Sequence, residues 1–163
     1  MVGISPPEAR TADSGAMFVG HGDRIMRILI ADRQAATRSA LRMLLQEEDG
    51  LTVVGEAADS ENLLSQMVPA HPDIVLLDWD LPGAPIQTLL SAIRASGNHV
   101  YVVVLSGRSE DVGNALAAGA DAFVSKANPP TQLVMAVNGL FSGEDHGESR
   151  KGSCQTNASS GLR

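Results

Sequence analysis

The chain has 163 residues, of which 44% are hydrophobic but only 3% aromatic, and its formal net charge is −7. This length favours one domain with an aliphatic core, and the negative charge argues against a nucleic-acid surface, which needs clustered lysine and arginine. The single cysteine, Cys154, excludes an internal disulfide and fits a reducing cytosol. No apolar run approaches the roughly 20 residues of a membrane helix, and residues 1–10 lack the pattern of a secretion signal.

The composition divides the chain into three parts. Residues 1–24 are rich in glycine, proline and serine with scattered charge, and we expect a flexible N-terminal extension there. Residues 144–163 are polar and have no hydrophobic periodicity, which predicts a disordered tail. Residues 25–143 lie between them and form the expected domain.

Short apolar stretches rich in β-branched residues alternate, along this domain, with stretches of helical periodicity. The expected strands are residues 26–31, 52–57, 73–77, 100–105 and 122–125. Two of them, 73–77 and 100–105, are apolar almost throughout, which is typical of central strands in a parallel sheet covered on both faces.

The intervening stretches place apolar residues at helical spacing. These residues are Leu41, Leu44 and Leu45, the pairs Leu63/Met67 and Leu64/Val68, and finally Leu133, Val137, Leu140 and Phe141. Asp59, Pro85 and Asn128-Pro129 are typical helix-start signals. Since helical crossovers impose parallel strands with right-handed connections, the pattern predicts an α/β fold. It is a (βα)5, doubly wound, open five-stranded parallel sheet with helices on both faces.

Four polar residues follow four of the expected strands. Asp32, Asp78, Ser106 and Lys126 come after the first, third, fourth and fifth strands. Any one of them alone is typical of a turn, a helix cap or a solvated side chain. Because ligands of open α/β sheets bind outside the carboxyl ends of the strands, the four together indicate one shared site.

The segment 26–142 resembles the receiver domain of two-component response regulators, which have a flavodoxin-like fold. The resemblance rests on "ILIADRQ", "DIVLLDWDLPG", "VVVLSG" and "GADAFVSK", in this order and at suitable spacing. It implies a signalling module rather than an enzyme. Such a module accepts a phosphoryl group from a histidine kinase, a phosphotransfer protein or a small phosphodonor.

The resemblance also implies a role for each site residue. Asp78 would accept the phosphoryl group, Ser106 would hydrogen-bond it, and Lys126 would pair with it. Phe123 matches the aromatic switch residue, and Asp80 would offer its backbone carbonyl to a metal ion. These residue types suit the chemistry, since a carboxylate is a nucleophile and phosphoryl transfer needs positioning and charge neutralisation.

One position departs from the family pattern. Receivers normally carry two adjacent acids after the first strand, but Arg33 stands where the second acid belongs. A pair of unit charges about 4 Å apart interacts by ~4 kcal/mol at an effective dielectric constant of ~20. We therefore expect Mg²⁺, held by Asp32, Asp78 and the carbonyl of Asp80, to bind weakly or not at all. Arg33 would either point to solvent or bridge to Asp78 and mimic the cation.

Three other functions share parts of this pattern. The D-x-D of Asp78 and Asp80 also occurs in haloacid-dehalogenase phosphatases, but two βα units precede it here and no later acidic pair follows Lys126. A flavin-binding protein would need a phosphate-binding loop of Ser, Thr and Gly after the first strand. The segment "DRQAATRS" has no glycine, which argues against this function. A receiver-like protein-interaction module that works without phosphorylation, because of Arg33, stays open.

The expected output is a protein contact in the cytoplasm, with no nucleic acid or membrane as partner of this chain. The resemblance implies that a downstream protein, or a second copy, binds the face made by the fourth helix, the fifth strand and the fifth helix. The last helix, "LVMAVNGLFSGE", is similar to receivers that precede a helix-turn-helix domain. Only about twenty residues follow it, too few for such a domain, so a stand-alone receiver and a truncated regulator are both open.

Overall fold

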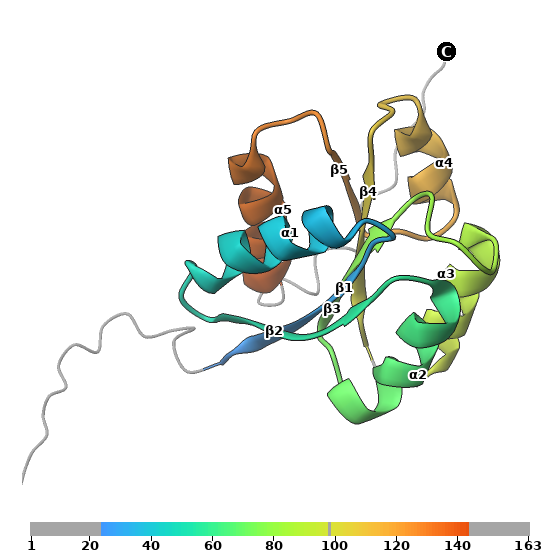
Figure 1. The fold of residues 1–163 in the computed structure, drawn as a ribbon, viewed down its shortest axis with the longest axis horizontal. Coiled ribbons are helices and arrows are strands. Elements are labelled where there is room, and N and C mark those ends of the chain that lie inside the picture. The colour runs from blue at the N-terminus through green and yellow to red at the C-terminus, as the bar shows by residue number, and fades with distance from the viewer. Residues whose placement is uncertain (1–23, 98, 144–163) are drawn as a thin grey trace, which may run out of the picture.

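Five strands and five helices alternate along the chain in the structure, a computed structural model that describes residues 24–97 and 99–143, the side chains of 141–143 excepted (Figure 1). The elements are β1 (Met26–Ala31), α1 (Ala35–Gln46), β2 (Leu51–Ala57), α2 (Ser60–Ala70), β3 (Ile74–Asp78), α3 (Ile86–Ala95), β4 (Tyr101–Ser106), α4 (Asp111–Ala117), β5 (Ala122–Ser125) and α5 (Pro130–Gly143). The predicted strands are confirmed, with shifts of one residue at ends of β2, β3 and β4.

The two flanking segments fall almost wholly outside this range. The interpretations of residues 1–23 and 144–163, as an extension and a tail, concern residues outside the described ones. Arg24 is described, and its Nη2 lies 3.6 Å from Asp73 Oδ1. This ion pair brings Arg24 to the start of β3.

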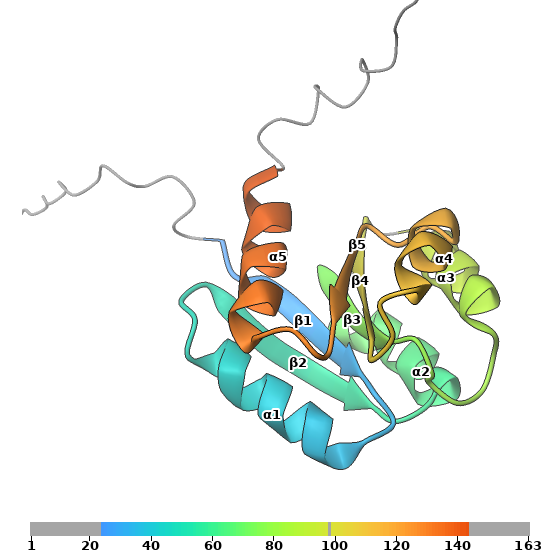
Figure 2. The ribbon, with the colours of Figure 1, turned by 90° about the horizontal axis from the view of Figure 1, so that it is seen from above.

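All neighbouring strands are parallel, in the order β2-β1-β3-β4-β5. Because β1 has β2 on one side and β3 on the other, the chain changes direction across the sheet at β1. Figure 2 shows α1 and α5 on one face of the sheet and α2, α3 and α4 on the other. The predicted doubly wound fold is confirmed, and its switch point lies where ligands of such sheets bind.

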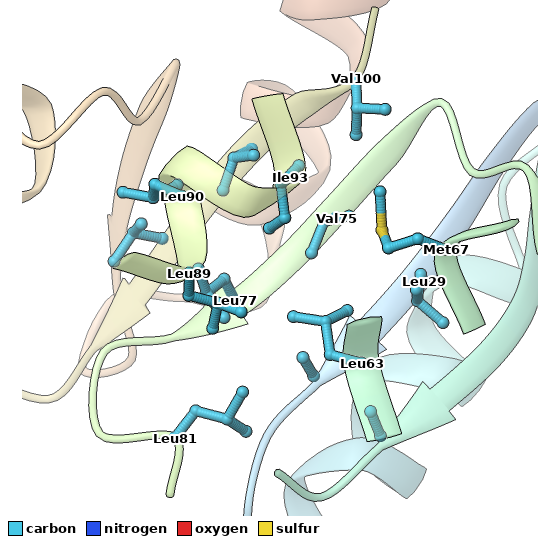
Figure 3. Packing of buried hydrophobic residues seen from close by; sticks show 14 of the residues in the cluster. Leu29, Leu63, Met67, Val75, Leu77, Leu81, Leu89, Leu90, Ile93 and Val100 are labelled. Carbon is cyan, nitrogen blue, oxygen red and sulfur yellow. The ribbon is translucent and has the colours of Figure 1, made fainter. Parts of the chain in front are cut away.

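Alternate residues of the central strands supply two cores, one on each face. In β1, Met26, Ile28 and Ile30 pack with α1 and α5, whereas Leu29 and Ala31 pack with α2, α3 and α4. Figure 3 shows the second core, where side chains of β3 meet those of α2 and α3. Since both faces are covered, the central strands need apolar residues at every position, which explains their continuous apolar runs.

Helix α2 confirms both the predicted helix-start residue and the predicted helical spacing. The Asp59 carboxylate accepts a hydrogen bond of 2.8 Å from the Asn62 backbone N–H, which caps the helix and lowers the pKa of Asp59. Leu63 and Met67 are buried as expected. Leu64 and Val68 lie in the helix as predicted, but Val68 is 70% exposed because the buried stripe of α2 follows Leu63 and Met67.

The loop after β3 is fastened to the start of α2. The backbone N–H of Ser60 donates to Pro82 O at 2.9 Å, and the Ser60 hydroxyl accepts from the N–H of Ala84 at 2.8 Å. Gly83 lies between these two contacts with φ at 112°, a conformation that favours glycine. The Pro-Gly pair that follows Asp78 therefore holds the β3–α3 loop against α2.

This packing predicts a large effect for Gly83→Ala. A Cβ at this position would overlap Ser60 Oγ and lie 3.0 Å from Ser60 Cβ. Gly119→Ala is the matched control, since Gly119 has the same φ of 112° but nothing within 4 Å of its added Cβ. We expect Gly83→Ala to lower the free energy of unfolding by about 1–3 kcal/mol more than Gly119→Ala. Urea denaturation measures both losses, and equal losses would contradict the contact with Ser60.

Candidate functional site

Three charged side chains meet at the carboxyl edge of the sheet. The Lys126 ammonium donates to Asp32 Oδ2 at 2.7 Å and to Asp78 Oδ1 at 3.0 Å. Asp32 is fully buried and Asp78 is 2% exposed, whereas the Lys126 side chain is 27% exposed. Lys126 directly follows β5 and reaches across the end of β4 to contact both acids. The structure thus brings together three of the four residues in the way the sequence predicted.

Backbone contacts hold both carboxylates in place. Asp32 Oδ1 accepts a hydrogen bond of 2.8 Å from the N–H of Gln34, and the Arg38 guanidinium donates to Asp32 O at 2.7 Å. Asp78 is the last residue of β3, and its Oδ1 accepts from the N–H of Asp80 at 3.3 Å. Both acids are therefore positioned by the strand ends and by the first residues of the loops that follow.

The charges of this group do not balance. Two carboxylates face one ammonium, so one negative charge is left over within the group. Asp78 Oδ2 is buried and has no hydrogen-bond partner in the described part of the chain. A buried acceptor without a partner is uncommon and unfavourable. The site is therefore disposed to receive a cation or a hydrogen-bond donor at Asp78 Oδ2.

The protonation of Lys126 follows from its two partners. Burial lowers the pKa of Lys126, but hydrogen bonds and charges from Asp32 and Asp78 together outweigh burial and raise it. The ammonium therefore stays charged throughout the neutral range, as a fixed point charge beside Asp78.

Ser106 lies at the same edge, but its hydroxyl points elsewhere. Ser106 ends β4, is 1% exposed, and its carbonyl accepts from the N–H of Lys126 at 2.7 Å. Its hydroxyl donates to Asp111 Oδ2 at 2.7 Å and accepts from the N–H of Arg108 at 3.0 Å. The Ser106 hydroxyl is thus engaged by the β4–α4 loop and by α4.

Arg108 and Asp111 belong to the site although the sequence analysis did not select them. Arg108 Nε donates to Asp111 Oδ2 at 3.1 Å, and Arg108 Nη2 donates to Asp80 Oδ1 at 3.3 Å. The hydrogen bond from Arg108 to Asp111, then the charges of Asp111 and Asp80, raise the pKa of Arg108. The available signal was a cation two residues and an acid five residues after a strand-ending serine.

The sequence from residue 28 to residue 138 matches the family model described as the response regulator receiver domain. The chain belongs to this family. Receiver domains are signalling modules, and the parallel sheet with its acid at the end of β3 accords with that membership.

Individual relatives agree with the family match. The chain is 42% identical to protein-glutamate methylesterase/protein-glutamine glutaminase 6 of Anaeromyxobacter dehalogenans, over 63% of this chain and 30% of that protein. It is 32% identical to the Fimbriae Z protein of Salmonella typhimurium, over 71% of this chain and 56% of that protein. The match thus spans less than two thirds of either relative.

A solved structure of a response regulator superposes on this chain. A two-component response regulator of the LuxR family from Aurantimonas sp. SI85-9A1 superposes with a TM-score of 0.67 at 29% identity. The match covers 73% of this chain and 86% of that chain. The receiver fold is therefore shared over nearly all of the described residues.

Phe123, the residue at the receiver's aromatic switch position, lies in β5 beside the site. It is partly buried and packs against the core that β1, β3 and β4 share with α2, α3 and α4. In the sheet it pairs with Val104, two residues before Ser106. Phe123 thus lies close to Ser106 along the sheet, and its role as a switch residue stays a prediction.

Arg33 takes no part in the charged group. It is exposed and forms no ion pair or hydrogen bond with other residues of the described part of the chain. The interpretation in which Arg33 bridges to Asp78 was wrong, since Lys126 occupies that role.

Receivers generally bind Mg²⁺ at this edge of the sheet. Mg²⁺ is commonly held by one or two carboxylates together with several waters, and Asp78 Oδ2 is a buried oxygen without a partner. Asp32 supplies a second carboxylate, whose two oxygens already accept from Lys126 and Gln34. No three His, Cys, Asp or Glu residues cluster as metal ligands among residues 24–97 and 99–143. The two carboxylates of Asp78 and Asp32 are therefore compatible with Mg²⁺, although they are few for such a site.

The charged group predicts a specific stability loss for Lys126→Met. Without the ammonium, two buried carboxylates face one another, and removing one partner of a buried ion pair costs about 3 kcal/mol. In the wild type the stabilisation by Lys126 is complete below the ordinary pKa of lysine and is lost as pH rises through its raised pKa. The difference in free energy of unfolding between the wild type and Lys126→Met should therefore be full at neutral pH and shrink at alkaline pH, as the wild-type ammonium loses its proton.

Arg33→Met is the matched control, because it removes the same charge from an exposed position. We expect it to change the free energy of unfolding by no more than about 0.5 kcal/mol. Urea denaturation of both variants across this pH range makes the comparison, and losses of equal size would contradict the buried network.

Proposed function

We propose that this chain is a phosphoacceptor receiver of a two-component phosphorelay, with Asp78 as the acceptor. The observation that carries the proposal is the state of the Asp78 carboxylate. One oxygen is hydrogen-bonded to Lys126, and the other is buried at the switch point of the sheet, without a partner among the described residues. A positioned carboxylate beside a fixed cation is suited to in-line attack on a phosphoryl group.

The proposed step is a phosphoryl transfer. An Asp78 carboxylate oxygen attacks the phosphorus of a phosphohistidine or an acyl phosphate. The new O–P bond forms as the donor's P–N or P–O bond breaks, and the electron pair leaves with the donor. Lys126 neutralises charge on the transferred oxygens. Mg²⁺, when bound, supplies a further positive charge to these oxygens.

The donor in this proposal is a histidine kinase or a phosphotransfer protein. A cavity of about 730 Å³ lies beside Lys126 and is mostly apolar; α1 residues such as Leu41 and Leu44 line one side, and Pro129 and Leu133 line the other. An apolar surface next to the reacting groups supports docking of a protein donor rather than only a small one.

The output in this proposal is a contact made by the face of α4, β5 and α5. Three apolar side chains on it are well exposed: Val112, Leu116 and Met135. Helix α4 has seven residues, about two turns, and buries only Asp111 and Ala115, so it should shift at modest cost. The partner is a downstream protein or a second copy.

The domain division and location belong to the same proposal. Residues 25–143 form the receiver, and residues 1–24 and 144–163 flank it. No helix among the described residues is both long and apolar enough to cross a membrane. A role in the cytoplasm is proposed from the family, and the enzymatic or DNA-linked activities of longer relatives are not assigned to this chain.

A second candidate function is protein contact without phosphorylation. Arg33, in place of an acid, favours it because the site then holds only two carboxylates. The Ser106 hydroxyl, already engaged by Asp111, favours it as well. In this case the α4, β5 and α5 face has one state, and phosphodonor does not alter partner binding.

Asp78→Asn discriminates between these two functions. With radiolabelled acetyl phosphate and Mg²⁺, we expect label on the wild type and none on Asp78→Asn, because the amide is not a nucleophile for this transfer. Asp49→Asn is the control, since Asp49 is an exposed acid outside the charged group and its loss should leave the chain competent for labelling. Label that survives in Asp78→Asn contradicts the acceptor, and an unlabelled wild type favours the second function.

Arg33→Asp tests the departure from the family pattern. It restores the adjacent acid, and we expect tighter Mg²⁺ binding, by about tenfold or more, because two units of charge change next to Asp32. Arg33→Ala separates the lost positive charge from the gained ligand and should give an intermediate affinity. Mg²⁺ titration followed by fluorescence of Trp79, the only tryptophan, measures all three proteins. Equal affinities would show that Arg33 has no influence on the metal.

A further inference from the structure

The Ser106 hydroxyl has a partner that competes with its proposed role. A hydroxyl has one proton to donate, and Ser106 donates it to Asp111 Oδ2 at 2.7 Å. Both groups are buried, with Ser106 1% and Asp111 7% exposed. Because hydrogen bonds to ionised groups are the stronger ones, Ser106 cannot turn to a phosphoryl oxygen without giving up a favourable contact.

Arg108 holds the acid in this arrangement. Its Nε donates to the same Asp111 oxygen at 3.1 Å, and its backbone N–H donates to Ser106 Oγ at 3.0 Å. Its Nη2 reaches Asp80 Oδ1 at 3.3 Å, in the loop that follows the acceptor. One residue therefore connects the serine, the start of α4 and the β3–α3 loop.

The contacts of Asp111 are not those of a helix cap. The N-cap residue of α4 is Glu110, which makes no side-chain cap hydrogen bond. The side-chain partners of Asp111 are Ser106 and Arg108, not backbone N–H groups of the helix. The buried position of Asp111 is thus explained by the serine and the arginine rather than by helix initiation.

We propose that Asp111, braced by Arg108, is a positioning residue that holds the Ser106 hydroxyl away from Asp78 and so opposes phosphorylation. The inference rests on the proposed function, because it assigns a regulator to the same site. Transfer of a phosphoryl group to Asp78 requires the Ser106 proton to leave Asp111 Oδ2 and turn to a phosphoryl oxygen. Asp111 then keeps only Arg108, and α4 loses its direct link to the end of β4.

The test compares labelling rates of the full chain with radiolabelled acetyl phosphate in the presence of Mg²⁺. In the transfer, the donor's P–O bond breaks, acetate leaves with the electron pair, and the Asp78 O–P bond forms. Asp111→Ala frees Ser106 and should raise the rate about three- to tenfold, as expected for the loss of one charged hydrogen bond. Asp111→Asn keeps an acceptor oxygen without the charge and should fall between Asp111→Ala and the wild type.

Glu110→Ala is the matched control, since it removes the same charge one residue earlier, from an exposed side chain without a hydrogen bond to the helix start. It should label at the wild-type rate. Thermal unfolding of each variant establishes that the compared proteins are folded. The amide NMR resonance of Arg108, whose N–H donates to Ser106 Oγ, gives a signature that a merely structural role would not move. In unphosphorylated Asp111→Ala it should shift toward its position in the phosphorylated wild type.

The outcomes separate this inference from the proposed function. Label on Asp111→Ala but little on the wild type supports the inference in its strongest form. A labelled wild type with equal rates in Asp111→Ala and Glu110→Ala overturns the role of Asp111 and leaves the proposed function intact. If no protein of the set accepts label, the proposed function fails and the inference fails with it.

Discussion

The contact of Lys126 with Asp32 and Asp78 is the interaction on which the rest of the structure depends. Two carboxylates that are almost inaccessible to solvent cannot stay ionised side by side without a cation. The sheet brings them together because β1 and β3 are neighbours, and the cation arrives from β5, two strands further. The network therefore ties three strand ends into one position, at the edge of a sheet whose two faces are covered by aliphatic cores.

The network gives a hydrogen-bond partner to three of the four carboxylate oxygens, but it leaves one negative charge unbalanced. Lys126 satisfies one oxygen of each acid, the N–H of Gln34 satisfies the second oxygen of Asp32, and Asp78 Oδ2 is left. A more balanced group would be more stable but would have nothing to offer a ligand. The unfavourable oxygen and the leftover negative charge are therefore the features of the site that a cation or a hydrogen-bond donor can engage.

The fold and the convergence of the site were predictable because they follow from local patterns. Apolar runs gave the strand ends to within one residue, and the strand ends determine where Asp32, Asp78, Ser106 and Lys126 lie. The directions of side chains were not predictable in the same way. Arg33 points to solvent and Ser106 turns toward Asp111 because of partners that come from other segments. Helical spacing likewise does not determine which side of α2 is buried, and the orientation of this helix on the sheet leaves Val68 exposed.

Two charge networks meet at the loop after β3, and their meeting point explains how one event at Asp78 would reach α4. The Lys126 network includes Asp78, whereas the Arg108 network includes Asp80, Asp111 and Ser106. Asp78 and Asp80 are two residues apart and joined by a hydrogen bond from the N–H of Asp80. The same loop is fixed on its far side to α2 through Ser60, so it resists movement there. In the proposed function, a change at Asp78 would therefore move the less anchored element, the short helix α4, rather than α2.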